Sequence, residues 1–354
     1  MTPDTDSQRT IVSSSFERHD LPLEESFTIS RGTTDTATVL TVELEDETGR
    51  VGVGGAGPAS YYDETPDSVE EVLPKLLEAV ESIGDPHAQQ VIEERLAALA
   101  PDEAAARAAV SIAVHDLAAT QADEPLYRRW GLDGARAPTT SYTIGIDSPD
   151  GMHDRAQRAR ERGYDVLKVK LGTDADRDRL EAVREAAPDA RIRVDANCAW
   201  TPEEGIKNTE WLADLSVEFL EQPVPSEDID GLRRISEEGA LPIAADESCV
   251  TATDVPAVAD AVDIVVVKLM KCGGLRPAQR QILAAKAHGL DVMLGCMTES
   301  NASIAGACQL TPLVEYADLD GALLLESDVY DGVAMPDGKI DLMSVDRGVG
   351  ISPR

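Results

Sequence analysis

The sequence predicts an α/β protein in which a TIM-like (β/α)7β barrel follows an N-terminal α+β capping domain. From about residue 141, short apolar segments alternate with amphipathic segments at intervals of roughly 25 residues, as strands and helices do in a barrel. In the first 125 residues, strand-like segments instead precede helix-like ones, as in α+β domains. No Gly-x-Gly-x-x-Gly turn follows an apolar segment of the second region, which argues against a doubly wound open sheet.

The first region, residues 1–125, forms the predicted capping domain. Strands are expected at residues 14–20, 25–31 and 37–45, and residues 49–54 are expected to form a turn that leads into another strand. Helices are expected at residues 68–98, with a break at Gly84-Asp85-Pro86, and at residues 102–122. The C-terminal segment 328–354 has no barrel helix, so we expect it to return to this domain and complete it.

The second region, residues 126–327, forms the predicted barrel. Its strands are expected at residues 142–146, 166–171, 192–196, 218–222, 243–246, 264–269, 292–295 and 317–319. Its helices are expected at residues 151–162, 175–187, 202–215, 228–238, 252–262, 276–288 and 302–310. Eight strands with seven helices between them favour a barrel over the open sheet.

Composition and charge limit the partners of the protein. The net charge is −34, which disfavours binding to nucleic acid and to anionic membranes. No apolar run approaches the roughly 20 residues that a membrane span needs, and the N-terminus lacks the form of a signal peptide. Five cysteines without zinc spacing indicate reduced thiols. We therefore expect a soluble cytoplasmic protein with a short, loose N-terminal tail.

Lysine is scarce, since only eight of the 32 basic residues are lysines. Few lysines, many acids and alanine-rich helices suggest a halophilic protein, because high salt screens the repulsion among surface carboxylates. Against this background, Lys168, Lys170 and Lys268 stand out because they lie in apolar, strand-like runs. A buried lysine is unfavourable unless it is paired or takes part in chemistry.

Acidic residues end three consecutive predicted strands between these lysines. Asp195, Glu221 and Asp246 should meet at one mouth, because side chains at the carboxyl ends of barrel strands converge there. Three carboxylates suit a hard divalent cation, Mg²⁺ before Mn²⁺, and the lack of aligned His or Cys argues against zinc. Asn197 and Gln222 are expected to orient these ligands.

The lysines are predicted to act as acid and base. Lys170 on the second barrel strand and Lys268 on the sixth should face each other across the mouth, which suits proton removal on one side and return on the other. A useful amine base needs a pKa about 3 units below the reference value of about 10.4. A neighbouring cation such as Lys168, a metal and burial would all act in that direction.

The ordered motifs resemble the enolase superfamily in its muconate-lactonizing subgroup over nearly the whole chain. They are Lys168-Val-Lys170, Asp195-Ala-Asn197, Glu221-Gln-Pro223, Asp246-Glu-Ser248 and Lys268-Leu-Met-Lys271-Cys-Gly-Gly274, with a capping segment from Phe27 to Thr33. The resemblance implies Mg²⁺-assisted removal of a proton next to a carboxylate, with Lys168 helping to stabilise the enediolate. It also implies a homo-oligomer.

Within that subgroup, the eighth strand is similar to that of dipeptide epimerases. Asp318 and Asp320 in Tyr-Ala-Asp-Leu-Asp-Gly match their Asp-x-Asp signature, and two carboxylates there would pair with the free ammonium of a dipeptide. The default substrate class is L-Ala-D/L-Glu, with Arg31 as a partner for an acidic second side chain. Thr143 is expected to bind the substrate backbone, and Glu299 to lie near the substrate.

Other activities stay open at this point. An N-acylamino acid (N-succinylamino acid) racemase or an o-succinylbenzoate synthase-like enzyme would use the same metal and bases. A sugar-acid dehydratase is disfavoured, because no His–Asp pair follows the later strands. A binding protein on a decayed barrel is disfavoured because the lysines and carboxylates are intact.

Overall fold

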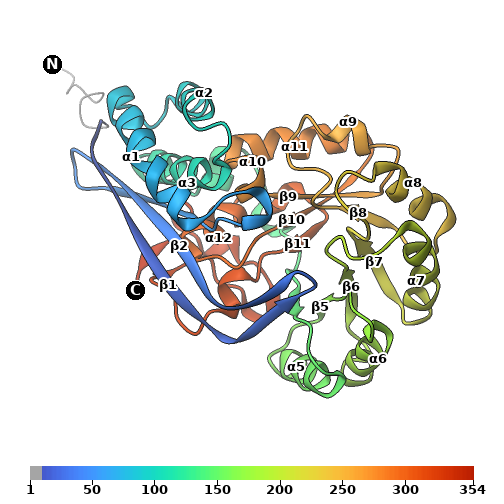
Figure 1. Ribbon diagram of the computed structural model, residues 1–354. Helices are drawn as coiled ribbons and strands as arrows, with labels where there is room; N and C mark the ends of the chain where they lie inside the picture. The colour runs from blue at the N-terminus through green and yellow to red at the C-terminus, as the bar shows by residue number, and fades with distance from the viewer. Residues whose placement is uncertain (1–9) are drawn as a thin grey trace.

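A computed structural model describes residues 10–354 of the chain, and the tail predicted at the N-terminus lies almost wholly outside them. The described chain contains a three-stranded antiparallel sheet, an eight-stranded parallel sheet and a small two-stranded sheet. Figure 1 shows the three-stranded sheet beside the helices α1 to α3, with the parallel sheet and its helices on the opposite side of the molecule. The predicted fold class is confirmed.

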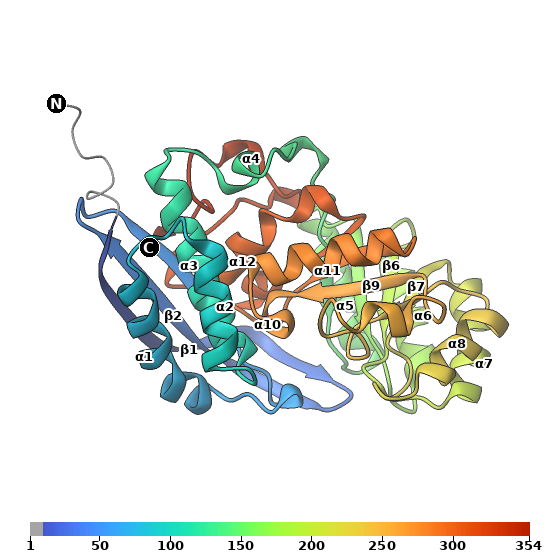
Figure 2. The same ribbon diagram turned by 90° about the horizontal axis from the view of Figure 1, so that it is seen from above.

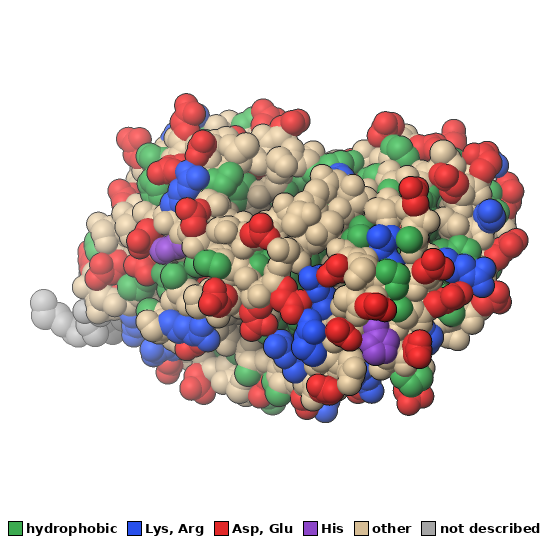
Figure 3. All heavy atoms as spheres, turned by 60° about the horizontal axis from the view of Figure 1, so that its bottom comes forward, with side chains coloured by type: hydrophobic (Ala, Val, Ile, Leu, Met, Phe, Trp, Pro, Cys, Tyr) green, Lys and Arg blue, Asp and Glu red, His purple; other side chains and the backbone are tan. Residues whose placement is uncertain are grey.

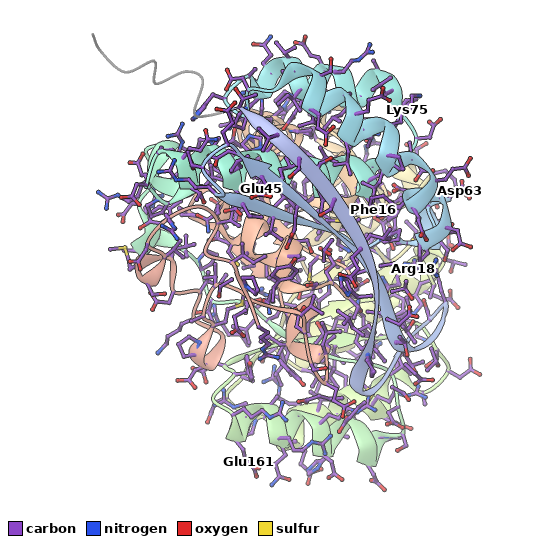
Figure 4. All side chains as sticks on the ribbon, turned by 90° about the vertical axis from the view of Figure 1, so that its left-hand side faces the viewer. Phe16, Arg18, Glu45, Asp63, Lys75 and Glu161 are labelled. Atoms are coloured by element: carbon purple, nitrogen blue, oxygen red, sulfur yellow. The ribbon has the colours of Figure 1, made fainter. Side chains whose placement is uncertain are left out.

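The N-terminal sheet consists of β1 (Ile11–Ile29), β2 (Gly32–Asp46) and β3 (Val51–Ala56). The prediction of two separate strands at residues 14–20 and 25–31 is wrong, because β1 is continuous and pairs with β2 on both sides of a register shift between Pro22 and Phe27. The hairpin of β1 and β2 therefore extends far beyond the part of β2 that pairs with β3, and Arg31 lies in its turn. Figure 4 shows β1 running past Phe16 and Arg18 toward the end of the molecule where Glu161 lies.

Two helices, α1 (Pro66–Ile83) and α3 (Ala104–Gln121), cover one face of this sheet, and α2 (Gln89–Leu99) packs against both of them. Thr65 and Ser68 form a capping box at the start of α1, and Gly84 ends it in the left-handed conformation with φ 76°. The alanine-rich α3 is buried along nearly its whole length and contacts both the sheet and the barrel. A Cβ on Gly54 would lie 2.0 Å from the carbonyl oxygen of Ala109, so glycine allows this close approach. Figure 2 shows α3 on the barrel side of α1.

The barrel strands run in sequence order and all pair in parallel. They are β4 (Tyr142–Ile144), β5 (Val166–Lys170), β6 (Arg191–Asp195), β7 (Val217–Glu221), β8 (Ile243–Ala245), β9 (Ile264–Lys268), β10 (Asp291–Gly295) and β11 (Tyr316–Asp318). A bridge between Thr140 and Ala317 links the two ends of the sheet. All carboxyl ends of these strands therefore face one mouth.

Six of the seven predicted barrel helices are present as substantial helices: α5 (Pro149–Glu161), α6 (Asp176–Ala186), α7 (Pro202–Asp214), α8 (Ile229–Glu238), α11 (Leu275–Ala287) and α12 (Asn301–Cys308). The prediction of a helix over residues 252–262 is wrong, because only the single turn α9 (Val255–Val258) forms there. The Asp254 carboxylate accepts hydrogen bonds from the backbone N–H groups of Val250 and Thr251, which stabilises a turn instead. Two short helices, α4 (Leu126–Arg129) and α10 (Leu269–Cys272), were not predicted.

The C-terminal segment contains β12 (Tyr330–Asp331) and β13 (Ser352–Pro353) and returns to the N-terminal elements. The backbone N–H of Val349 donates to Asp116 of α3 at 2.7 Å, and the Tyr330 hydroxyl donates to Glu43 of β2 at 2.8 Å. One hydrophobic cluster runs from the capping helices into the barrel, so the boundary at residue 125 stays a prediction.

The surface carries the large excess of acidic side chains that the composition requires. Figure 3 shows Asp and Glu side chains scattered over one face, with Lys and Arg side chains between them. Over residues 10–354, no helix combines the length and the apolar character that crossing a membrane requires.

Candidate active site

Strand register brings the predicted site residues into two rows at the barrel mouth. Lys170 on β5 pairs with Asp195 on β6, which in turn pairs with Glu221 on β7. On the other side, Gly295 on β10 lies between Lys268 on β9 and Asp318 on β11. The residues come from segments far apart in the chain, and the parallel register alone places them side by side.

Lys168 lies among three of the carboxylates. Its Nζ is 2.7 Å from Asp318, 2.8 Å from Glu221 and 3.3 Å from Asp195, and its side chain is only 2% exposed. Lys170 contacts Asp195 at 2.6 Å. The two lysines of the Lys-x-Lys motif therefore face the same side of β5, as residues two apart in a strand must.

Asp246, just after β8, contacts two lysines with different oxygens. Lys268 Nζ donates to Oδ2 at 2.7 Å, and Lys271 Nζ donates to Oδ1 at 2.6 Å. A Cβ on Gly295 would lie 3.1 Å from Lys268 Cε, so glycine on the neighbouring strand leaves room for this lysine. The sequence prediction did not assign a role to Lys271, although its position one helical turn after Lys268 was the available signal.

Burial and charge act against each other in this cluster. Burial and the nearby Asp195 raise the pKa of Glu221 to about 8, although Lys168 acts to lower it. Burial also disfavours the charged form of Asp195, but the adjacent lysines lower its pKa below the usual range. Burial lowers the pKa of Lys268 as well, yet Asp246 raises it to a net value above the usual range.

The backbone after two of the predicted ligands adopts unusual conformations. Asn197, Cys198 and Gln222 all have positive φ angles, of 45°, 66° and 37°. Such conformations are unfavourable by about 1–3 kcal/mol each and cluster at functional sites. Asn197 donates to Asp195 at 3.2 Å, and Gln222 accepts the backbone N–H of Asp246 at 3.0 Å. Both residues contact the acids that they were predicted to orient.

Asp318 and Asp320, the two acids predicted to bind an ammonium, lie at the end of β11 and two residues after it, and Asp318 contacts Lys168. Asp318 accepts a hydrogen bond from the Ser141 hydroxyl at 2.5 Å as well as from Lys168. Asp320 accepts the backbone N–H of Thr143 at 2.6 Å. Burial and the charge of Asp318 raise the pKa of Asp320 to about 7, whereas Lys168 outweighs burial and lowers the pKa of Asp318. The sequence did not reveal Ser141.

The hairpin turn places Arg31 at the mouth. Its guanidinium is 2.8 Å from Glu247 and lies over the ring of Tyr61, 4.4 Å from the ring centroid. Glu299 lies in the loop between β10 and α12. It is buried and accepts hydrogen bonds from the backbone N–H of Met297 and the hydroxyl of Ser303. A Cβ on Gly57 would lie 2.7 Å from Glu299 Cγ, so the loop from the first domain closes tightly over Glu299.

The donor set fits a divalent cation. Asp195, Glu221 and Asp246 are at most 1% exposed. The buried Asn197 Oδ1 beside them has no hydrogen-bond partner among the described residues, whereas Glu221 Oε2 lies 2.8 Å from Lys168 Nζ. Lysine ammonium groups lie between the carboxylates. Within residues 10–354, no group of three or more Asp, Glu, His or Cys side chains lies close enough together to hold a metal ion in this arrangement. Carboxylate oxygens are nevertheless the ligand type that Mg²⁺ prefers, so the three acids suit this ion by their chemistry.

The nearly closed parallel barrel with its antiparallel capping sheet is the enolase-type architecture. Two family models match the chain, "Mandelate racemase / muconate lactonizing enzyme, N-terminal domain" over residues 12–131 and "Enolase C-terminal domain-like" over residues 151–354. These matches define the class of protein as a barrel enzyme of the enolase superfamily.

Individual relatives show to which enzymes of this superfamily the chain is similar. An L-Ala-D/L-Glu epimerase of Bacteroides thetaiotaomicron is 37% identical over 95% of this chain and 86% of its own length. A hydrophobic dipeptide epimerase of Enterococcus faecalis is 36% identical over 94% of this chain and 96% of its own length. The crystal structure of a dipeptide epimerase from the same organism, complexed with Mg and L-Leu-L-Tyr, has a TM-score of 0.91 and 35% identity over 97% of this chain and 99% of the other.

This chain belongs to the mandelate racemase/muconate lactonizing enzyme family of the enolase superfamily, and within it to the dipeptide epimerases, which are isomerases.

Proposed function

We propose that the protein epimerises dipeptides by 1,1-proton transfer at the α-carbon next to the substrate carboxylate, with Lys170 and Lys268 as the two acid/base groups. The observation that carries this proposal is their placement. Lys170 ends β5 and Lys268 ends β9, and these strands are four apart in a sheet of eight. Two amines on opposite sides of one mouth suit removal of a proton from one face of a carbon and its return to the other.

Asp195, Glu221 and Asp246 would hold Mg²⁺, with Mn²⁺ as an alternative. Bound there, the cation would act as a Lewis acid toward the carboxylate of the substrate and lower the energy of the enediolate. Lys168 would supply the second positive charge, since it is buried and already contacts two carboxylates within 3 Å. Asn197 and Gln222 would keep the ligands in place through the contacts described above.

Asp318 and Asp320 would bind the free α-ammonium of the dipeptide. Asp320 supports this role because it is buried, lies beside the charge of Asp318 and has a pKa raised to about 7. An ammonium group would relieve that unfavourable charge, whereas the neutral amide of an N-acyl substrate would not. Thr143 would lie beside the substrate backbone, since its own N–H already contacts Asp320.

The preference for the second residue of the dipeptide is the open part of the proposal. L-Ala-D/L-Glu remains the default class, with Arg31 beside the second side chain and Glu299 near the substrate. The Arg31 guanidinium already contacts Glu247, however, so an acidic side chain would have to share it. The alternative is racemisation of N-succinylamino acids, because an N-succinyl Arg/Lys racemase of Bacillus cereus has a TM-score of 0.89 at 26% identity.

One exchange experiment tests the function. The protein is incubated in D₂O at high salt with Mg²⁺ and a dipeptide library, and α-deuterium uptake is followed by mass spectrometry. We expect uptake in dipeptides with a free ammonium and none in their N-succinyl or N-acetyl counterparts. Uptake only in N-succinylamino acids would favour the racemase, and uptake in neither would contradict both. Size-exclusion chromatography of the same sample tests the predicted homo-oligomer.

A further inference from the structure

Lys271 is the most completely satisfied cation of the site. Its side chain is fully buried in α10, directly after β9. Its Nζ lies 2.6 Å from both the backbone oxygen and Oδ1 of Asp246, 2.9 Å from the Val266 oxygen and 3.1 Å from the Cys249 oxygen. An ammonium has only three N–H groups, so four acceptors leave none of them free for another partner.

These contacts make the two carboxylate oxygens of Asp246 unequal. Oδ1 is held by Lys271 from the interior of the protein. Oδ2 contacts Lys268, one of the residues at the mouth. The backbone is held as well, since the N–H of Asp246 donates to Gln222 and its oxygen accepts from Lys271. The carboxylate therefore cannot turn to present both oxygens to the mouth without breaking buried hydrogen bonds.

We propose that Lys271 restricts Asp246 to binding a metal through Oδ2 alone, and that it thereby favours Mg²⁺ over Ca²⁺ at this site. Mg²⁺ requires a compact octahedron of single oxygen ligands at about 2.0–2.1 Å. Ca²⁺ takes six to eight oxygens at about 2.3–2.6 Å and often binds a carboxylate through both oxygens. A lysine that occupies one carboxylate oxygen removes a ligand that only the larger ion can use. Lys271 is in this sense a positioning residue, and the inference rests on the metal site of the proposed function.

The decisive measurement is the ratio of two dissociation constants. Isothermal titration calorimetry with Mg²⁺ alone and with Ca²⁺ alone gives Kd(Ca)/Kd(Mg) for the wild type, for Lys271→Met and for Lys286→Met, an exposed control. We expect the ratio to fall about tenfold or more in Lys271→Met and to stay unchanged in the control. If both metals weaken in parallel, Lys271 is merely structural and the inference is wrong.

A second measurement covers the case in which Lys271→Met does not fold. A crystal structure of the wild type soaked in Ca²⁺ should show Asp246 coordinating through Oδ2 alone while Oδ1 remains on Lys271. Coordination through both oxygens would overturn the inference. Wild type that binds neither metal would instead contradict the metal site of the proposed function, so the two failures are distinguishable.

Discussion

Two ion pairs of nearly equal length lie in very different regions of the molecule. Lys268 and Asp246 at the barrel mouth are 2.7 Å apart, and their side chains are 8% and 2% exposed. Lys286 and Glu315 on the outside of the barrel are 2.6 Å apart, and their side chains are 38% and 37% exposed. If distance alone decided, the two ion pairs would interact with equal strength. Solvent makes the difference, because water and salt screen the outer pair and hardly reach the inner one.

The comparison indicates where a charged side chain depends on its partner and where solvent can take the place of that partner. A buried pair that loses one partner leaves an uncompensated charge, which destabilises a protein by about 3–5 kcal/mol, whereas an exposed pair contributes about 0–1 kcal/mol. The predictions below test this contrast in order of decreasing effect.

Replacing the inner lysine should have the largest consequence. Lys268→Met removes one of the two proposed acid/base groups, and we expect epimerisation to fall by about 10³–10⁴-fold, within the usual range for such a group. The rate is measured by polarimetry or by α-deuterium exchange, with Lys207→Met on the exposed face of α7 as a control. A Lys268→Met variant with full epimerisation would rule out the two-base mechanism.

Lys168→Met should destabilise the fold itself. Its ammonium lies within 3.3 Å of three buried carboxylates, so its removal leaves like charges together in the interior. We expect the free energy of unfolding to fall by about 3–5 kcal/mol in urea denaturation. A change as small as that of the exposed Lys207→Met would show that the carboxylates become protonated or hydrated at little cost.

Asp116 offers a buried carboxylate held by backbone N–H groups rather than by an ammonium in contact. Burial raises its pKa to about 7, although the N–H groups of Val53 and Val349 act to lower it. A pKa above the ordinary 3.8 means that its stabilising effect is complete below pH 4 and is lost as the pH rises through 7. From pH 5 to pH 7 this group should lower the free energy of unfolding by about 2 kcal/mol.

Asp116→Asn should remove that part of the pH dependence. Unfolding free energies of the wild type and the variant are compared at several pH values between 4 and 8, because the difference between them cancels the effect of the other acids. A constant difference across this range would contradict the raised pKa of Asp116.

Salt should act on the outer region as a whole. The net charge of −34 implies repulsion among surface carboxylates, and the Debye length falls from about 10 Å at 0.1 M to about 3 Å at 1 M salt. We expect the unfolding temperature to rise by several degrees when KCl is raised from low to molar concentration. A melting temperature that falls with KCl would argue against the halophilic interpretation, which stays a prediction.

The exposed pair itself should matter least. Lys286→Met should change the free energy of unfolding by less than about 1 kcal/mol, and by still less in molar KCl. The double replacement with Glu315→Gln gives the coupling energy directly. A coupling comparable to that of a buried pair would mean that exposure does not govern the strength of these contacts.

Much of the candidate site was predictable because it follows from strand order. Lys170, Asp195 and Glu221 end consecutive parallel strands, and such ends must meet, so their spacing in the sequence was sufficient. The contact between Arg31 and Glu247 joins residues that are far apart in sequence, and no local pattern specifies it. It depends on a hairpin longer than predicted, whose continuation past Pro22 is decided by pairing with β2.

The buried contacts of Lys271 could not be read from the sequence for a different reason. A lysine one turn beyond a strand can point to solvent or inward, and only the packing of α10 decides between them. The helix predicted over residues 252–262 failed because the Asp254 side chain competes for local backbone N–H groups. The periodicity of apolar residues predicts neither local competition for backbone hydrogen bonds nor the way in which a helix packs in the folded protein.

The bridge between Thr140 and Ala317 has a consequence for biosynthesis. Because the two ends of the barrel meet through this bridge and through the contacts of Ser141 with Asp318 and of Thr143 with Asp320, the last strand must leave the ribosome before the mouth can form. Contacts between residues so far apart in sequence form late in folding, because the chain loses the entropy of closing a long loop before the contact stabilises it. Nascent chains that end before residue 317 should therefore carry the three lysines but lack Asp318 and Asp320, and they would depend on chaperones until the candidate site is complete.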